Sequence, residues 1–335
     1  MKIAVIGGGA IGSVMAGFLA KAAENTEDIL LVGRGDHVKE INKTGLRVVT
    51  SDGDESIRVR AATCLDQEYD LVIFTVKTMD LEQAYQDNHS LLEAPWIMTT
   101  QNGVQGANIL CSHFDPKKMI SSIVMFGATY LKPGEVTLNF PGKWIMGKTY
   151  APNDETFKKI AQILGTAFPV VVTDKIMGMK WLKIFVNFNN CIPALLGKSM
   201  QETFADMDFC KLSILLLKEG LEVVEEAGIG LVSLPDFPVD RIYGLTRMPL
   251  DQAAGILQKT LTTLSREPLY GSILQSLMRH RSTEIDFING EVCQVARSLR
   301  RQAPLNIKIV DLVHEIENSR RFFGSEEVKE IFNLN

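Results

Sequence analysis

A lysine and an asparagine stand one helical turn apart in a strongly apolar stretch of this sequence. Lys183 and Asn187 occupy positions i and i+4 of the segment 180–187, so a helix places them on one face. Burial beside apolar surface makes a lysine more acidic, and such a lysine can protonate the alkoxide formed when a carbonyl is reduced. The asparagine can position the lysine or hold a substrate. Taken alone, the spacing favours a lysine that extends from the helix flank into solvent.

A second candidate for chemistry is Glu284. Apolar residues recur at helical spacing from Ile285 to Ala296, and Glu284 lies at the edge of this stripe, near the expected start of the helix. The helix dipole favours a carboxylate there, and the side chain can face a cleft or simply be an exposed cap residue. The dipeptide Asn289-Gly290 also allows a hairpin in place of the helix.

Three glycines near the N-terminus have the spacing GxGxxG. They follow an apolar run at 2–6 and precede residues with helical spacing. Gly7 permits a tight turn, Gly9 allows a pyrophosphate to approach the backbone, and Gly12 allows close packing of helix on strand. Amides at the start of the helix attract phosphates. The sequence therefore predicts that the loop binds a dinucleotide through Gly7, Gly8, Gly9, Ala10, Ile11 and Gly12, the alternative being a glycine-rich turn without a ligand.

The choice of dinucleotide depends on the end of the second expected strand, at 28–32. Enzymes that use NAD carry an acidic residue there, which holds the ribose 2′-hydroxyl. This chain has Gly33-Arg34 instead, and a guanidinium suits a 2′-phosphate through paired hydrogen bonds. We therefore predict NADP(H), with Arg34 in the cofactor site, unless Arg34 is an ordinary surface arginine.

Two further polar residues follow buried strands directly. Lys77 ends the strand expected at 70–76, and Asn102 comes just after the strand at 96–99. Ligands of parallel α/β sheets bind beyond the carboxyl ends of the strands. Lys77 can meet a phosphate or a substrate carboxylate, and Asn102 can bind the nicotinamide region or the substrate. Both residues can also be plain loop residues, because Asn102-Gly103 is a common turn dipeptide.

Two kinds of element must position these residues. Over the first 170 residues, strands and helices alternate, which is typical of a parallel, doubly wound sheet, with a hairpin around 51–54 and antiparallel additions. Helical patterns dominate after Val172. We predict a Rossmann-type α/β domain at 1–172 and an all-α domain at 173–335. The long helices are expected at about 176–196, 207–227, 250–264, 284–300 and 307–318.

Composition narrows the class of protein. The 335 residues are 46% hydrophobic and carry a net charge of -5, so no basic excess points to nucleic acid or an anionic membrane. No apolar run reaches the roughly 18 to 20 residues of a membrane span. The cysteines are odd in number and no pair has CxxC spacing, so a cytoplasmic protein is expected. The five cysteines and five histidines are dispersed, so neither a disulfide framework nor a metal site is expected. The apolar stretch 212–217 is compatible with a core or with a homodimer interface.

In combination, these motifs resemble the ketopantoate reductase (2-dehydropantoate 2-reductase) family along nearly the whole chain. The segment Thr283–Gly290 and the pattern Trp-x-Lys-x-x-x-Asn at 181–187 are quite specific to that family. The other matching segments are Gly7–Gly12, Gly33-Arg34, Thr75–Lys77, Gln101–Gly103, Gly127-Ala128 with Pro133-Gly134, and Ser272–Gln275.

The resemblance implies a Rossmann domain followed by a helical domain, and NADPH-dependent reduction of 2-dehydropantoate to (R)-pantoate in pantothenate biosynthesis. It implies that Lys183 is the catalytic lysine and general acid, and that Glu284 assists at the nicotinamide and the substrate. It also favours a helix over a hairpin at 284–290. By the same resemblance the substrate contacts are Asn102, Asn187 and Ser272, and the cofactor contacts include Lys77, Arg34, Ala128 and Asn102.

Three positions depart from the family pattern. Cys191 and Leu269 stand where the family often has asparagine, and Ser276 replaces a common acidic residue. A thiol is a weak hydrogen-bond partner and leucine offers none, so the substrate can be another branched or bulkier 2-oxo acid. A non-catalytic NADPH-binding sensor is a further alternative. A dehydrogenase of the 6-phosphogluconate type also combines these domains with a catalytic lysine, but it lacks the segment at 283–290.

Overall fold

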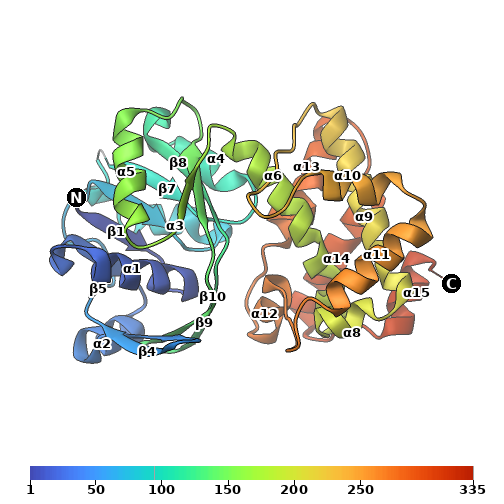
Figure 1. Cartoon of the computed structure of the whole chain (residues 1–335), viewed down its shortest axis with the longest axis horizontal. Coiled ribbons are helices and arrows are strands. Elements are labelled where there is room, and N and C mark those ends of the chain that lie inside the picture. Colours follow the sequence, from blue (N-terminus) through green and yellow to red (C-terminus); the bar gives the residue numbers. More distant parts are fainter. Residues whose placement is uncertain (94, 335) are drawn as a thin grey trace. The chain divides into compact units, whose positions relative to one another are not determined.

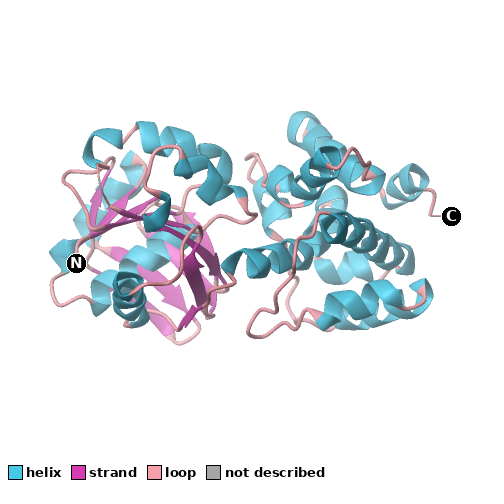
Figure 2. Ribbon diagram, turned by 90° about the horizontal axis from the view of Figure 1, so that it is seen from above, coloured by secondary structure: helices cyan, strands magenta, loops and turns pink. Residues whose placement is uncertain are grey.

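The chain folds into two compact units, Met1–Met177 and Gly178–Asn335 (Figures 1 and 2). The structure, a computed structural model, describes residues 1–93 and 95–334. All named strands belong to the first unit, while the described part of the second unit consists of helices, loops and one isolated bridge between Leu234 and Phe237. The predicted fold class, an α/β Rossmann-type domain followed by an all-α domain, is confirmed.

An eight-stranded sheet with the order β12-β11-β8-β7-β6-β1-β2-β5 forms the centre of the first unit. Neighbouring strands are parallel except β8 and β11, which run antiparallel. The strand order reverses at β1, which is where open α/β sheets bind ligands. The strands are β1 (Ile3–Ile6), β2 (Ile29–Val32), β5 (Arg60–Ala62), β6 (Leu71–Phe74), β7 (Trp96–Thr99), β8 (Met119–Val124), β11 (Trp144–Lys148) and β12 (Val170–Val172).

The central strands are apolar throughout because both of their faces are buried. In β1, Ile3 and Val5 belong to the hydrophobic core on one side of the sheet, and Ala4 and Ile6 to the core on the other side. Strands β2 and β6 alternate in the same way. The helices and 3-10 turns of this unit are α1 (Ala10–Ala22), η1 (Thr26–Asp28), α2 (Gly35–Thr44), η2 (Thr78–Asp80), α3 (Leu81–Gln86), η3 (His89–Leu91), α4 (Gln105–Cys111), η4 (Pro116–Lys118) and α5 (Glu155–Gly165).

A second, four-stranded sheet packs against α1. Its order is β4-β3-β10-β9, with β3 and β10 parallel and the two outer pairs antiparallel. The hairpin expected around 51–54 is present, although its second strand already begins at Gly53. Gly17 of α1 faces Leu46 of this sheet, where an added Cβ would lie 3.0 Å from the leucine side chain. The strands are β3 (Leu46–Thr50), β4 (Gly53–Ile57), β9 (Gly127–Lys132) and β10 (Glu135–Phe140).

The five helices predicted for the second unit are present, two of them with breaks, and the structure adds shorter helices at 200–204, 240–247, 272–278 and 325–332 that were not predicted. The helix expected at 176–196 is interrupted by a 3-10 turn, and the helix expected at 284–300 starts as a 3-10 turn and breaks at Ile288. The apolar residues around 212–217 lie mainly in the core of this unit. The elements are α6 (Ile176–Asn187), which begins in the first unit, then η5 (Phe188–Asn190), α7 (Cys191–Leu196), α8 (Met200–Phe204), α9 (Met207–Glu226), α10 (Asp240–Arg247), α11 (Leu250–Thr262), α12 (Ser272–Met278), η6 (Ile285–Phe287), α13 (Asn289–Ser298), α14 (Pro304–Ser319) and α15 (Ser325–Phe332).

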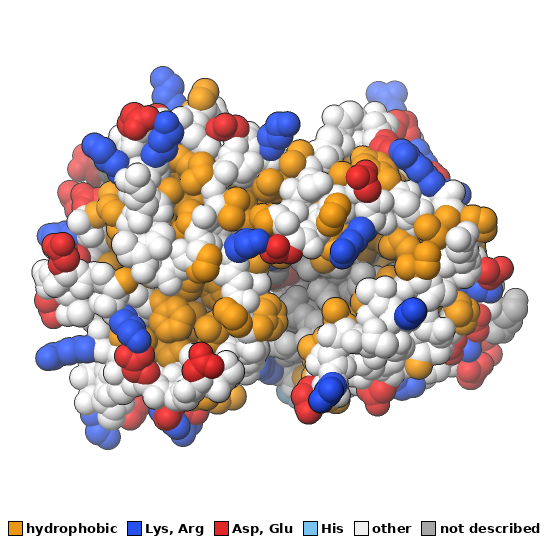
Figure 3. All heavy atoms as spheres, in the orientation of Figure 1, with side chains coloured by type: hydrophobic (Ala, Val, Ile, Leu, Met, Phe, Trp, Pro, Cys, Tyr) orange, Lys and Arg blue, Asp and Glu red, His pale blue; other side chains and the backbone are white. Residues whose placement is uncertain are grey.

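The surface carries charges of both signs. On the face visible in Figure 3, basic and acidic side chains are interspersed over each unit. Among the helices of the described residues, none combines the length and apolar character needed to cross a membrane. Within residues 1–93 and 95–334, no group of three or more His, Cys, Asp or Glu side chains is arranged to hold a metal ion.

Candidate functional site

The glycine loop connects β1 to α1, and each of its three spaced glycines meets a different steric demand. Gly7 has φ +124°, and a Cβ there would lie 2.6 Å from the backbone nitrogen of Val76. At Gly12, a Cβ would lie 2.1 Å from the carbonyl oxygen of Gly7. Gly9, the N-cap of α1, has open space where a side chain would be. The first amides of α1 adjoin this space, and such amides lack partners within a helix. The loop therefore offers a cradle that fits a pyrophosphate.

The buried side chain of His37 lies beside the glycine loop. The Gly134 amide donates to His37 Nδ1 over 2.9 Å, so Nε2 carries the hydrogen and donates to Ser13 Oγ, also over 2.9 Å. Burial lowers the pKa of His37, which keeps the ring neutral at pH 7. A Cβ on Gly8 would lie 3.2 Å from the His37 ring. His37 thus ties α1, α2 and the second sheet to the glycine loop. It was not recognised in the sequence, where it is a lone histidine.

The ends of β6 and β7 are joined by side-chain hydrogen bonds from Thr100 and Gln101, and Thr100 Oγ1 donates to the carbonyl oxygen of Phe74 over 3.0 Å. Gln101 makes two such bonds. Its Nε2 donates to the carbonyl oxygens of Phe74 and Val76, each over 2.8 Å. The first of these residues ends β6, and the second immediately precedes Lys77. Because Gln101 itself precedes Asn102, it holds the segments bearing Lys77 and Asn102 together at the carboxyl edge of the sheet. Both of these side chains are partly buried.

The two remaining candidates of the first unit lie in different surroundings. Arg34 is the exposed N-cap of α2, directly after β2 and Gly33. Ala128 is partly buried on β9 of the second sheet, opposite Leu138, a few residues beyond the carboxyl end of β8. Along the main sheet, the order β7, β6, β1, β2 therefore places Asn102, Lys77, the glycine loop and Arg34 at consecutive strand ends.

In the second unit, α6 carries a line of polar residues on an otherwise apolar helix. Lys183 is partly buried among Leu182, Ile184 and other buried residues. Burial lowers its pKa to about 8, and the negative charge of Glu284 acts in the opposite direction. Lys180 is buried more deeply; burial lowers its pKa to about 7, assisted by the charge of Lys183 and opposed by that of Glu284. Lys180 was not predicted as a site residue, although its position three residues before Lys183 was a signal.

The backbone at Glu284 is fixed in place through the residues on either side of it, Thr283 and Ile285. The Thr283 amide donates to Glu317 Oε1 over 2.6 Å, and Ile285 is fully buried. Glu317 in turn bonds to His314 Nδ1 at 2.8 Å, and His314 Nε2 lies 3.0 Å from Asp286 Oδ1. These carboxylates raise the pKa of His314, although burial opposes them. The segment that bears Glu284 is thereby fixed to α14.

The position expected to depart from the family pattern, Cys191, points into the protein core. It is fully buried, and its thiol donates to the carbonyl oxygen of Phe188 over 2.9 Å. Burial raises the pKa of this thiol to about 12. The 3-10 turn η5 directly precedes Cys191. In such a turn, residues three apart in the chain eclipse each other. Asn190, the last residue of this turn, is partly buried, and its side chain faces Gly271.

Asn190 lies beside the predicted substrate residue Ser272, the exposed first residue of α12. The contact is made at the preceding Gly271, where an added Cβ would lie only 2.6 Å from Asn190 Oδ1. Leu269 makes its hydrogen bond through the backbone: its amide donates to Gln201 Oε1 over 3.0 Å. Sequence reasoning missed Asn190, because the expected helix gave no sign of the tighter turn.

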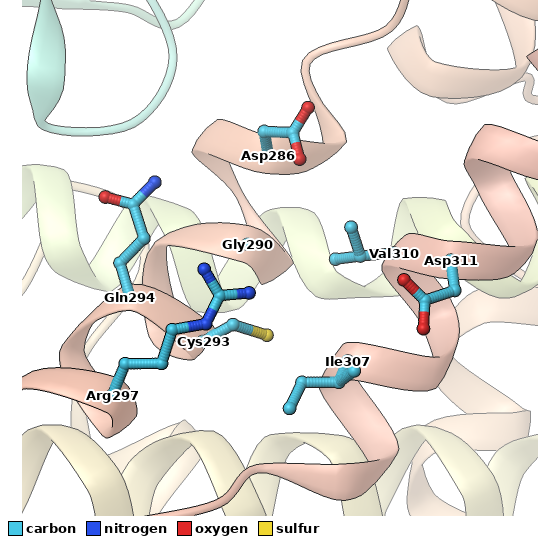
Figure 4. A pocket seen from close by; sticks show the side chains of 8 residues that line it. All are labelled: Asp286, Gly290, Cys293, Gln294, Arg297, Ile307, Val310 and Asp311. Carbon is cyan, nitrogen blue, oxygen red and sulfur yellow. The ribbon is translucent and has the colours of Figure 1, made fainter. Parts of the chain in front are cut away.

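A hollow of about 60 Å³ lies between α13 and α14 and contains none of the predicted site residues. Figure 4 shows the thiol of Cys293 and the side chains of Arg297 and Asp311 directed toward it. Small-molecule sites usually have about 300–1,000 Å³, so this hollow can hold a few water molecules but not a dinucleotide. The candidate functional site therefore consists of the residues described above and not of those that line this hollow.

These features define a class of protein: the fold and the glycine loop are those of a pyridine-nucleotide-dependent oxidoreductase. More specifically, the chain belongs to the ketopantoate reductase family. The family model described as ketopantoate reductase PanE/ApbA matches residues 3–150, and its C-terminal counterpart matches residues 175–317. The family predicted from the sequence motifs is therefore confirmed.

Named relatives extend over almost the whole chain. The 2-dehydropantoate 2-reductase of Pyrococcus abyssi is 30% identical, with coverage of 93% of this chain and 97% of the relative. The enzyme of the same name from Pyrococcus horikoshii is also 30% identical, over 95% and 98% of the two chains.

Solved structures share the fold. A PanE/ApbA family ketopantoate reductase from Ralstonia eutropha superposes with a TM-score of 0.80 at 26% identity, over 95% of this chain and 99% of that chain. A D-mandelate dehydrogenase, described as a ternary structure with NADH and anilino(oxo)acetate, gives a TM-score of 0.81 at 24% identity with the same coverage. At this identity the second likeness concerns the fold alone.

Proposed function

We propose that this protein reduces 2-dehydropantoate to (R)-pantoate with NADPH. The observation that carries the proposal is Lys183, a lysine on an apolar helix whose pKa is lowered to about 8 in the presence of Glu284. The glycine cradle and the relatives named 2-dehydropantoate 2-reductase support it independently.

Lys183 is the proton donor in this proposal. A lysine with a pKa of about 8 is mostly protonated at pH 7, yet it releases its proton more readily than an ordinary lysine. Its ammonium group stabilises the negative charge that develops on the keto oxygen and then transfers a proton to that oxygen. When bound, NADPH supplies the hydride that adds to the keto carbon. Glu284 keeps Lys183 charged, because its carboxylate favours the ammonium form.

The cofactor contacts proposed for the first unit are the loop Gly7–Gly12, Arg34, Lys77, Asn102 and Ala128, with Glu284 contributing from the second unit. The glycine cradle suits the pyrophosphate, and the exposed guanidinium of Arg34 after β2 suits a 2′-phosphate. The fold itself does not exclude NADH, because the D-mandelate dehydrogenase of similar fold is in complex with NADH. The two cofactors therefore have to be compared directly.

The substrate contacts proposed are Asn102, Lys183, Asn187 and Ser272, to which we add Asn190. Asn190 lies against Gly271, next to Ser272. Its side-chain amide can supply the hydrogen bonds of the asparagine that the family often has where this chain has Cys191. This removes part of the reason for expecting a different substrate, since Cys191 points into the core.

The test is a panel of 2-oxo acids, with oxidation of NADPH and of NADH followed by absorbance. The panel includes 2-dehydropantoate, other branched 2-oxo acids and an aromatic one. We expect 2-dehydropantoate with NADPH to give the highest kcat/KM. A higher value for another acid would support the alternative of a related reductase, and tight NADPH binding without any turnover would support a non-catalytic sensor.

A further inference from the structure

Lys180 is a second lysine on α6, and the mechanism proposed above does not use it. Lys180, Lys183 and Asn187 stand at i, i+3 and i+7 of one helix, so they form a single stripe. Only 5% of the surface of Lys180 is exposed. The adjoining residues Trp181 and Leu182 are also buried. Lysine is almost never buried to this extent unless it interacts with charged or polar groups, so Lys180 marks a place where such groups meet.

The stripe and Glu284 form one electrostatic group. Lys180 experiences the charges of both Lys183 and Glu284, and Lys183 experiences the charge of Glu284. These three residues contain two groups that can be cationic and one that is anionic. With both lysines protonated, the three side chains have one positive charge in excess. An anion that bound beside them would balance this charge, and it would favour the protonated form of each lysine.

A 2-oxo acid is such an anion, and its shape matches the stripe. It carries a carboxylate and a ketone on adjacent carbon atoms. Helix residues three apart have Cβ atoms about 5–6 Å from each other, and lysine side chains are long enough to converge from that spacing on two adjacent groups.

We propose that Lys180 binds the carboxylate of the 2-oxo acid while Lys183 serves the keto oxygen, an inference that rests on the proposed reductase function. In this arrangement Lys180 determines specificity: it favours keto acids over uncharged ketones of the same shape. A purely structural Lys180 would not discriminate between a charged and an uncharged substrate.

The experiment compares 2-dehydropantoate with its methyl ester in the wild-type enzyme and in Lys180→Met, which keeps the length of the side chain but removes its charge. Lys218→Met, at an exposed position of α9, is the matched control. Binding of NADPH, followed by its fluorescence, checks that each variant is folded. We expect the KM of Lys180→Met for the acid to rise about 10- to 100-fold, as for loss of a charged hydrogen bond, and its KM for the ester to stay nearly unchanged.

The preference for acid over ester decides the outcome. A preference that falls in Lys180→Met and persists in Lys218→Met supports the proposal. An equal loss with acid and ester overturns it, because Lys180 would then act on the chemistry or on the fold. If the wild-type enzyme reduces 2-dehydropantoate and Lys180→Met does so equally well, only this inference fails. If the wild-type enzyme reduces no 2-oxo acid, the proposed function fails and this inference fails with it.

A second variant, Lys180→Arg, keeps the test decisive even where Lys180→Met does not fold. A guanidinium stays protonated, whereas Lys180 has a pKa of about 7. The KM of the wild-type enzyme for the acid is therefore expected to rise by up to about tenfold per pH unit above pH 7, and the KM of Lys180→Arg to rise much less. The same pH dependence of KM in both enzymes would overturn the proposal.

Discussion

The two units of this chain hold their functional residues in different ways. In the first unit, the residues proposed to bind the cofactor lie at four consecutive strand ends, apart from Ala128 on β9, and backbone geometry and hydrogen bonds position them. In the second unit, the residues proposed to act on the substrate lie along one face of α6 and at the starts of α12 and η6. There, burial and neighbouring charges set their chemical properties.

The contrast follows from what each ligand requires. A pyrophosphate is bound by backbone amides at a helix start, so glycine and open space matter more than side-chain chemistry. Proton transfer to a ketone requires a group with a suitable pKa, and burial away from water lowers the pKa of a lysine toward that range. Substitutions in the first unit should therefore change cofactor affinity, and substitutions in the second unit should change turnover and substrate affinity.

The largest effect is expected for Lys183→Ala. Loss of the proton donor should lower kcat by about 10²- to 10⁴-fold while NADPH binding is kept. Steady-state kinetics and NADPH fluorescence measure the two quantities, and Lys218→Ala is the control. Unchanged turnover would remove Lys183 from the mechanism.

Arg34→Gln should come next. A charged hydrogen bond to the 2′-phosphate contributes about 1.5–3 kcal/mol of binding free energy. Its loss should raise the KM for NADPH about 10- to 100-fold and leave the KM for NADH nearly unchanged. Arg58→Gln, at an exposed position of the same unit, is the control. An equal effect on both cofactors would argue against a 2′-phosphate contact.

The pH dependence of the wild-type enzyme tests the acid–base properties of the second unit. The protonated form of Lys183 is the active one, and its pKa is about 8. The kcat/KM for the uncharged methyl ester of 2-dehydropantoate should therefore be level below pH 8 and fall up to about tenfold per pH unit above it. A profile that stays level to pH 10 would contradict the lowered pKa.

Gly9→Ala probes the cradle of the first unit. Its methyl group meets no protein atom within 4 Å, so the fold should persist, while the space for the pyrophosphate is partly filled. We expect the Kd for NADPH to rise about tenfold, comparable to one net hydrogen bond. Gly165→Ala, where a Cβ also meets nothing within 4 Å, should leave the Kd unchanged.

The smallest effect is expected for Asn190→Ala. Loss of one hydrogen bond of about 0.5–1.5 kcal/mol should raise the KM for the 2-oxo acid about 2- to 10-fold. Cys191→Ala should leave that KM unchanged and lower the unfolding temperature, because Cys191 is fully buried. The reverse pattern would mean that Cys191, not Asn190, contacts the substrate.

Features that depend on local patterns were predictable. The glycine loop was recognised because a turn, a close approach and a helix contact all fall within six residues, and the structure gives each glycine a matching steric demand. The apolar strands at 2–6 and 70–76 were recognised because strands buried on both faces have no polar alternation. By contrast, the turn at 188–190 and the break at Ile288 were missed, since hydrophobic spacing hardly distinguishes a 3-10 turn from an α-helix.

The sequence by itself therefore determined the fold class of each unit, the glycine loop and the stripe that includes Lys183. Only the tertiary structure decided how those residues behave. The 3-10 turn η5 interrupts the expected helix just before Cys191, whose thiol is buried in the core, while Asn190 lies against Gly271. The acidity of Lys180 and Lys183 depends on burial and on Glu284, about a hundred residues away in the chain. Desolvation and charge act through space, so they depend on the packing of segments far apart in the sequence.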